Sequence, residues 1–191
     1  NPDADVLVTT AQNVIDTFEQ IDEQEGFTPF AAVAAETGTV NYEGVASFVA
    51  GTVDANENDT VTYAAIGSFV ATASFNGDPT VTATADRFFE LSNPGITNNE
   101  NSELSDIKVA GPIVGSFTYN LDVANFGGNA VADGTVAGSL ERLNGAIENF
   151  PGLEATGDFH GDDLDVLDVF TRGVRNQDTE FAVLSGTGLR Q

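Results

Sequence analysis

The sequence predicts a mostly β protein, an antiparallel, eight-stranded closed barrel with an N-terminal amphipathic helix. The first observation is a series of segments in which apolar and polar residues alternate with period two, as in strands with one buried face. The second is that small and large residues alternate along the apolar faces, which suits the interior of a small barrel. The third is a content of 14 Phe in 191 residues, enough to build a core without Trp, Met or Cys.

The N-terminal segment carries the convincing helical pattern of the chain. Between residues 9 and 25, apolar residues recur every three or four positions, at Ala11, Val14, Ile15, Phe18 and Ile21. We expect Thr9 or Thr10 to cap this helix and Gly26 to end it. The stripe is expected to pack on the body of the protein, with docking to a partner as the alternative. Residues 1–36 would form the helix and lead-in, and residues 37–191 the barrel domain.

Period-two alternation begins at residue 37 and predicts three consecutive strands. The inner face of the first strand consists of Val40, Tyr42, Gly44, Ala46, Phe48 and Ala50. After a turn at 54–59, the inner face of the second consists of Val61, Tyr63, Ala65, Gly67, Phe69, Ala71, Ala73 and Phe75. A hairpin turn at 76–79 leads to a third strand, Thr80 to Leu91, with Val81, Ala83, Ala85 and Phe89 along one side.

The rest of the chain predicts five more strands, which bring the total to eight. We place them at 106–111, 113–124, 130–140, 152–160 and 178–190. Residues 140–150 are also compatible with a short helix before Pro151, and residues 162–171 with a helical turn that has acidic residues at its start. Residues 92–105 lack periodicity and are expected to form a long surface loop, the kind of insertion that often carries function.

The charge balance excludes several classes of partner. The chain has 30 Asp and Glu against six Lys and Arg, a formal net charge of -24. Nucleic acid is excluded as a partner, because phosphate binding depends on neutralisation by Lys and Arg. Anionic membrane surfaces are disfavoured for the same reason. Such a charge attracts cations and basic proteins, or serves to keep the surface solvated in a salty medium.

The start of the sequence favours a location outside the cell or on its outer surface, and two absences limit how the chain is anchored and what chemistry it can perform. The sequence starts at Asn1-Pro2-Asp3 without an initiator Met, as expected for a mature form from which a signal peptide was removed. No apolar stretch approaches the 18 residues of a transmembrane helix. The absence of Cys excludes disulfides and thiol chemistry, and it leaves a lipid anchor open only if a precursor carries the modified cysteine.

Short glycine motifs resemble those of the β-barrel domain of transferrin-binding protein B and related bacterial surface lipoproteins. Gly38-Thr39-Val40-Asn41-Tyr42-Glu43-Gly44 is similar to the strand that opens that barrel, and Gly157-Asp158-Phe159-His160-Gly161 to a turn near its end. His160 stands where the family has Tyr, and Asp162 where it has Pro. The resemblance covers about residues 37–191. It implies an eight-stranded barrel with a binding role and names no particular ligand.

The sequence predicts no enzyme. A hydrolase needs a nucleophile and a base, and His160 is the one histidine of the chain. Ser68, Ser116 and Ser139 are available to pair with it, but none lies in a Gly-x-Ser-x-Gly turn. We therefore expect His160 to pack or to form hydrogen bonds at a turn, rather than to act in catalysis.

Calcium is the cofactor that the composition favours, because this ion prefers carboxylate and amide oxygens. Two acidic clusters offer such ligands. The first resembles the start of a calcium loop, without its Gly at position six or Glu at position twelve, and consists of Asp54, Asn56, Asn58 and Asp59. The second is the densest acidic segment and consists of Asp158, Asp162, Asp163 and Asp165. Solvated turns are the alternative for both clusters.

These observations predict a non-catalytic binding protein that is extracellular or displayed on the cell surface. Its loops at 52–60 and 92–105 are expected to contact the ligand, with acidic side chains that favour a basic or metal-bearing protein. The alternative is a structural subunit of an extracellular fibre or surface layer, stabilised by calcium, in which strand edges and an N-terminal arm pair between subunits.

Overall fold

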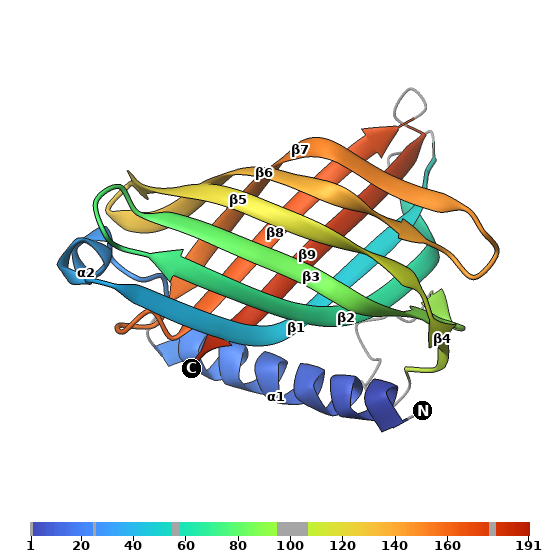
Figure 1. Ribbon diagram of the computed structural model, residues 1–191, viewed down its shortest axis with the longest axis horizontal. Coiled ribbons are helices and arrows are strands. Elements are labelled where there is room, and N and C mark those ends of the chain that lie inside the picture. Colours follow the sequence, from blue (N-terminus) through green and yellow to red (C-terminus); the bar gives the residue numbers. More distant parts are fainter. Residues whose placement is uncertain (1, 25, 55–57, 95–106, 176–178) are drawn as a thin grey trace.

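A computed structural model describes residues 2–24, 26–54, 58–94, 107–175 and 179–191. Within these residues, nine strands form one antiparallel sheet. The strands are β1 (Thr39–Val53), β2 (Asp59–Ser74), β3 (Thr80–Leu91), β4 (Val109–Pro112), β5 (Val114–Phe126), β6 (Asn129–Glu141), β7 (Ile147–His160), β8 (Val166–Arg175) and β9 (Glu180–Arg190). Eight of them follow one another around a barrel, which closes where β9 pairs with β1 (Figure 1). The predicted fold class is therefore confirmed.

The strand predictions hold for most of the barrel and fail at three places. The third strand has the predicted bounds, and the inner faces of β1 and β2 are largely buried as expected. Residues 140–150 form the end of β6, a turn and the start of β7, and not a helix. Residues 166–175 form β8, where a helical turn was expected. The predicted strand at 106–111 overlaps β4, which pairs with the end of β3 and lies outside the closed ring.

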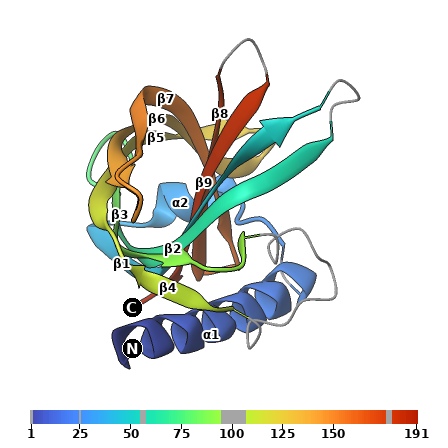
Figure 2. The ribbon, with the colours of Figure 1, turned by 90° about the vertical axis from the view of Figure 1, so that its right-hand side faces the viewer.

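Aromatic rings fill the middle of the barrel, and Figure 2 shows the strands curving around this interior. The rings of Phe48 and Phe117 lie parallel with their centroids 5.7 Å apart, and that of Phe150 lies 5.2 Å from Phe117. Each of these three side chains is at most 1% exposed. Interlocking of large side chains at this density is how a small barrel builds a core.

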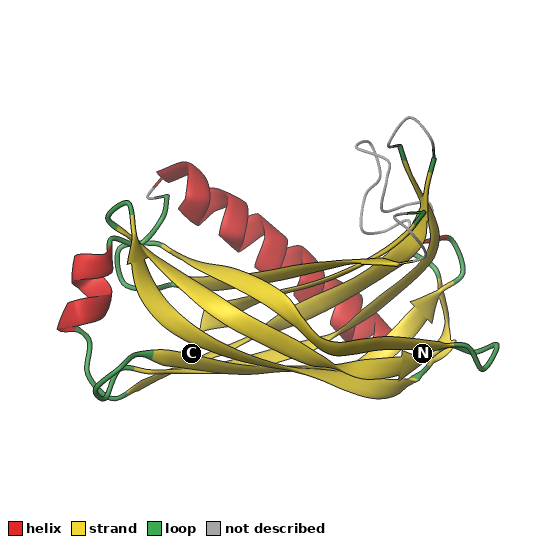
Figure 3. Cartoon of the chain, turned by 90° about the horizontal axis from the view of Figure 1, so that it is seen from above, coloured by secondary structure: helices red, strands yellow, loops and turns green. Residues whose placement is uncertain are grey.

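Helix α1 (Pro2–Gln24) lies outside the barrel, as Figures 1 and 3 show. It packs against β1, β2, β7 and β9. Its buried residues Ala4, Leu7 and Ala11 meet outward-facing apolar residues of the wall, among them Ile66 and Phe89. Of the predicted stripe, Ala11 and Val14 are buried on the body of the protein as expected, whereas Ile15 is 38% exposed. Within the described residues, neither helix has the length and apolar character needed to cross a bilayer.

The helix starts earlier than its stripe predicted. It begins at Pro2, a residue suited to the first helical position, with Asp3 in the first turn. Thr9 and Thr10 are not caps, because they lie inside the helix and donate hydrogen bonds from Oγ1 to the carbonyls four residues earlier, at 2.9 Å. Gly26 does follow the helix end, with φ 68° and its N–H bonded to the carbonyl of Ile21.

The lead-in between α1 and β1 closes one end of the barrel. It forms two isolated bridges, Phe27 with His160 and Pro29 with Asn129, and then the short helix α2 (Phe30–Ala35). Val33 of α2 is 1% exposed and belongs to the barrel core, and Phe30 packs against it. The apolar pattern of residues 27–36 did not predict this second helix. Residues 27–35 contact the barrel closely, and the proposed domain boundary at residues 36/37 stays a prediction.

A bulge interrupts the pairing of β2 with β3. The register shifts between Ile66 and Ser68, so that Arg87 has no partner residue on β2. Arg87 has φ 51°, a value unusual for a residue other than glycine. The extra residue reverses the alternation of β3: Phe88 turns into the barrel with 0% exposure, and Phe89 faces outward beneath α1. The prediction that Phe89 shares the inner face with Val81, Ala83 and Ala85 is therefore wrong.

Candidate functional site

The open outer wall of the barrel carries a line of aspartates across four neighbouring strands. Asp122 of β5 is the register partner of Asp133 of β6, and Asp158 of β7 is the partner of Asp168 of β8. The apolar residues next to them in sequence point into the barrel and are buried, so the four carboxylates face outward. We call these four residues the acidic face. Like charges placed directly opposite each other destabilise a sheet.

Two carboxyls of the acidic face are partly withdrawn from water. Burial raises the pKa of Asp168, while the hydroxyl of Thr187, which donates to its Oδ1 at 2.7 Å, lowers that pKa. Burial also raises the pKa of Asp158, nearby His160 lowers it, and the charge of Asp133 raises it again. The ionised pair therefore costs free energy in the folded protein, and a positive charge placed over it would recover part of that cost.

His160 packs at the edge of the acidic face, beneath the C-terminal part of α1. Its ring lies edge-on to Phe18, with centroids 4.8 Å apart, and 4.9 Å from the ring of Phe27. The residue is 5% exposed and ends β7 just before a turn. The expectation that His160 packs at a turn is confirmed, and the two aromatic partners explain how an imidazole is accommodated there.

The first predicted calcium cluster lies where β1 turns into β2. Asp54 accepts hydrogen bonds from the backbone N–H of Asn58 at 2.9 Å and from its side-chain amide. Asp59 forms an ion pair with Arg172 at 3.0 Å. Asn56 lies outside the described residues. The described carboxylates of this cluster are therefore engaged with partners from the chain itself.

The second predicted cluster is divided between a strand and a turn. Asp158 lies on the outer side of β7, whereas Asp162 and Asp163 are exposed in the turn to β8 and Asp165 lies against Gly161. The carbonyl of Asp163 accepts a hydrogen bond from Arg190. Over the described residues, no three His, Asp or Glu side chains group as a metal site would require. Calcium binding stays a prediction, to be checked by titrating calcium while following the midpoint of thermal unfolding.

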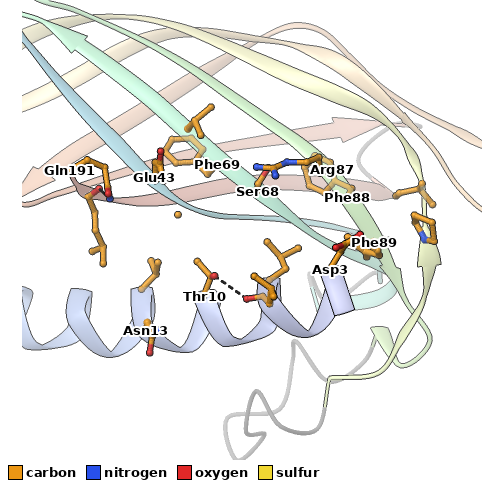
Figure 4. A pocket seen from close by; sticks show the side chains of 18 residues that line it. Asp3, Thr10, Asn13, Glu43, Ser68, Phe69, Arg87, Phe88, Phe89 and Gln191 are labelled. Carbon is orange, nitrogen blue, oxygen red and sulfur yellow. Dashed lines mark hydrogen bonds between the residues drawn. The ribbon is translucent and has the colours of Figure 1, made fainter. Parts of the chain in front are cut away.

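A groove of about 820 Å³ separates α1 from the outer wall of β1, β2 and β3, and Figure 4 shows it from close by. Its apolar lining comes from both sides, with Leu7 and Val14 on the helix and Val70, Phe89 and Ile113 on the barrel. A volume of this size is within the usual range for small-molecule sites. The sequence did not reveal the groove, because it depends on how the helix crosses the wall.

Arg87 is the positively charged residue among those that line the groove, and the bulge of β3 presents it there. Its Nε donates to Oγ of Ser68 at 3.0 Å and lies 3.3 Å from Oδ1 of Asp86. Ser68 in turn donates to the same Asp86 oxygen at 2.5 Å. In Figure 4 the guanidinium extends along the wall toward Ser68, and Asp3 and Thr10 approach from α1.

Comparisons with known proteins assign no family to this chain. Neither a protein-family model nor a curated protein matches this chain. Among solved structures, the chain is similar to Ail, the attachment invasion locus protein of Yersinia pestis, with a TM-score of 0.34 and 12% sequence identity. That similarity covers 82% of this chain and 100% of the Ail chain. A TM-score this low supports no inference about ligand, activity or location.

Proposed function

We propose that this protein is a non-catalytic binding protein, working outside the cell or on its surface, whose acidic face contacts a positively charged partner protein. The observation that carries the proposal is the pair of in-register Asp–Asp contacts, Asp122 with Asp133 and Asp158 with Asp168. Lys and Arg side chains of a partner would offset the repulsion within each pair. The net charge of -24 would steer such a partner toward the surface.

The polarity of the barrel supports surroundings of water. The inward residues are apolar, whereas the outward positions of β5 and β6 are mostly Thr, Ser, Asn and Asp. Barrels embedded in a membrane have the opposite arrangement, with an apolar outer band and a polar interior. This contrast fits a barrel that is displayed at a surface or secreted.

The eight-stranded barrel is what the resemblance to transferrin-binding protein B implies, and membership in that family stays a prediction. Ligand contacts were expected from the loops at 52–60 and 92–105. Residues 55–57 and 95–105 of these loops lie outside the described residues. The proposal therefore rests on the acidic face, and contacts from the two loops would add to it.

The alternative of a fibre or surface-layer subunit has less support. Each of the eight barrel strands pairs with two neighbours, and among the described residues the strand edges left in the ring are residues 147–155 of β7 and 171–175 of β8, which do not pair across the β7–β8 contact. Helix α1, the expected N-terminal arm, packs on its own barrel. Light scattering at high concentration, with and without calcium, tests this alternative, and a strict monomer in both conditions would exclude it.

Capture of partners from the native medium tests the proposed function. The immobilised chain is exposed to the medium at low salt, and bound proteins are eluted with a salt gradient. We expect a basic protein that elutes as salt rises, because screening weakens contacts between exposed charges. The double variant Asp122→Asn/Asp133→Asn should capture at least about tenfold less, in line with the loss of two charge contacts of roughly 1 kcal/mol each.

The matched control removes two charges elsewhere on the surface. Asp78→Asn lies in the β2–β3 turn and Glu19→Gln on α1, and both residues are exposed. This control should capture the partner as well as the original chain does. An empty eluate at low salt, or an equal loss in both variants, would contradict the proposal.

A further inference from the structure

We infer that the groove between α1 and the barrel wall is a second binding site, for a small monocarboxylate with an apolar body. The site lies on β1–β3 and α1, whereas the acidic face lies on β5–β8. The inference is therefore independent of the proposed partner protein.

The apolar part of the groove is open to a ligand. Val6 of α1 is 66% exposed and Val70 of β2 is 41% exposed, and both line the groove. Leu7, Phe89 and Ile113 form the deeper walls. A hydrocarbon chain lying along these residues would remove apolar surface from water on both sides, which is the main source of affinity in such sites.

Arg87 supplies the polar end of the site. Its Nε is held by Ser68 and Asp86, but its two terminal nitrogens have no hydrogen-bond partner among the described residues, and the side chain is 74% exposed. A guanidinium fixed through Nε presents its terminal N–H groups as a fork, the geometry that binds a carboxylate with two parallel hydrogen bonds.

The backbone conformation of Arg87 supports a role for its side chain in ligand binding. At φ 51° glycine is the residue with the least strain, yet this position in the bulge holds an arginine. Strained residues of this kind gather at ligand sites, where the surrounding structure keeps them in place. Gly67 lies opposite the bulge. There is no room for a side chain at this position, because a Cβ would lie 2.6 Å from the ring of Phe88.

The remaining charges of the groove limit the ligand to one anionic group. Asp3 on α1 and Glu43 on β1 also line it. They would repel a second carboxylate placed away from Arg87, so a dianion is disfavoured and a single carboxylate beside Arg87 is preferred. A headgroup without charge would leave the terminal N–H groups of Arg87 without a carboxylate partner, since Asp86 engages its Nε.

Calorimetric titration of the full chain with dodecanoate, below its micellar concentration, tests the inference. Dodecanol, which lacks the charge, and acetate, which lacks the chain, are the matched probes. We expect dodecanoate to bind at least about tenfold more tightly than either, since one charge-assisted pair contributes on the order of that factor. Amide chemical shifts should change for residues of the groove, such as Val6 and Val70.

Three variants make the test specific. Arg87→Gly, which suits the positive φ, should abolish the preference for dodecanoate over dodecanol. Val6→Asp, at an exposed position, should weaken dodecanoate binding at least tenfold by placing a carboxylate at the entrance. Lys108→Gln removes one positive charge from another exposed position and should change nothing. Undetectable dodecanoate binding, unchanged binding to Arg87→Gly, or shift changes confined to the acidic face would each overturn the inference, whatever the partner capture shows.

Discussion

The barrel wall has two outer sides that use the same strand positions differently. Under α1, the outward residues of β2 and β3 include Ala64, Ile66 and Phe89, which are buried against the helix. Across β5 and β6, the corresponding outward residues include Asp122 and Asp133, which face solvent. The apolar outward residues of β2 and β3 in this group are covered by α1, whereas Asp122 and Asp133 lie on a surface that no helix covers. The covered side contains the groove and the open side the acidic face.

The largest effect is expected from truncating Phe88 and Phe89, two neighbours that face opposite sides of the barrel wall. Phe88→Ala should lower the free energy of unfolding by about 3–5 kcal/mol, because it leaves a cavity in the closed aromatic interior. Phe89→Ala should cost less, because the helix above it can settle into the space. Urea unfolding of both variants gives the two values, and equal losses would contradict the distinction between interior and covered surface.

Strain in the bulge is tested at Arg87 by two small substitutions. Arg87→Ala and Arg87→Gly both lose the hydrogen bonds of Nε, but only glycine adopts φ 51° without strain. The glycine variant should therefore be the more stable of the two, by about 1–3 kcal/mol. Thermal or urea unfolding measures the difference. A more stable alanine variant would show that the backbone of the bulge is not strained.

The open side should make stability depend on pH. Burial raises the pKa values of Asp158 and Asp168 above that of an unfolded carboxyl, about 3.9. The folded protein then binds these protons more tightly than the unfolded chain does, so their contribution to stability is largest below that pH and is lost as pH rises through the raised values. Between about pH 4 and pH 7, we expect the free energy of unfolding to fall less for Asp168→Asn than for the original chain. Identical pH profiles for the two proteins would show that Asp168 does not titrate in this way.

The smallest change in the free energy of unfolding is expected at the exposed pair Asp122 and Asp133. Asp122→Asn/Asp133→Asn should raise the free energy of unfolding by about 0.2–1 kcal/mol, because it removes repulsion between directly opposed charges. The gain should shrink in high salt, which screens exposed charges. A loss of stability in low salt would mean that the two carboxylates are stabilised by interactions within the chain, and the acidic face would lose its argument for a partner.

The period-two alternation of apolar and polar residues predicted the regular strands of the barrel. The alternation in β1 and β2 identified inner residues such as Tyr42, Phe48 and Phe69, because regular strands keep period two. It failed at Phe89, where one extra residue reverses the faces and leaves no mark in the composition. It also failed at β8, where the aspartates of the preceding turn looked like the first turn of a helix.

The candidate sites were harder to predict because they depend on contacts between distant segments. The acidic face requires the register of four strands, which brings residue 122 beside 133 and residue 158 beside 168. The groove requires the position of α1 on β1–β3. Asp158 was singled out as a calcium ligand together with its neighbours in sequence, which did not reveal that it lies beside Asp168, a carboxylate of the next strand.

The pairing of β9 with β1 has a consequence for how the chain folds. Tyr42 is the register partner of Arg190, so the contact that closes the ring joins segments almost 150 residues apart. Contacts of such sequence separation carry a large loop-closure cost and form slowly. Until β9 arrives, β1 and β8 each have an open edge that can pair with another chain. A chain whose β9 has not yet joined the ring is therefore open to aggregation through these two edges.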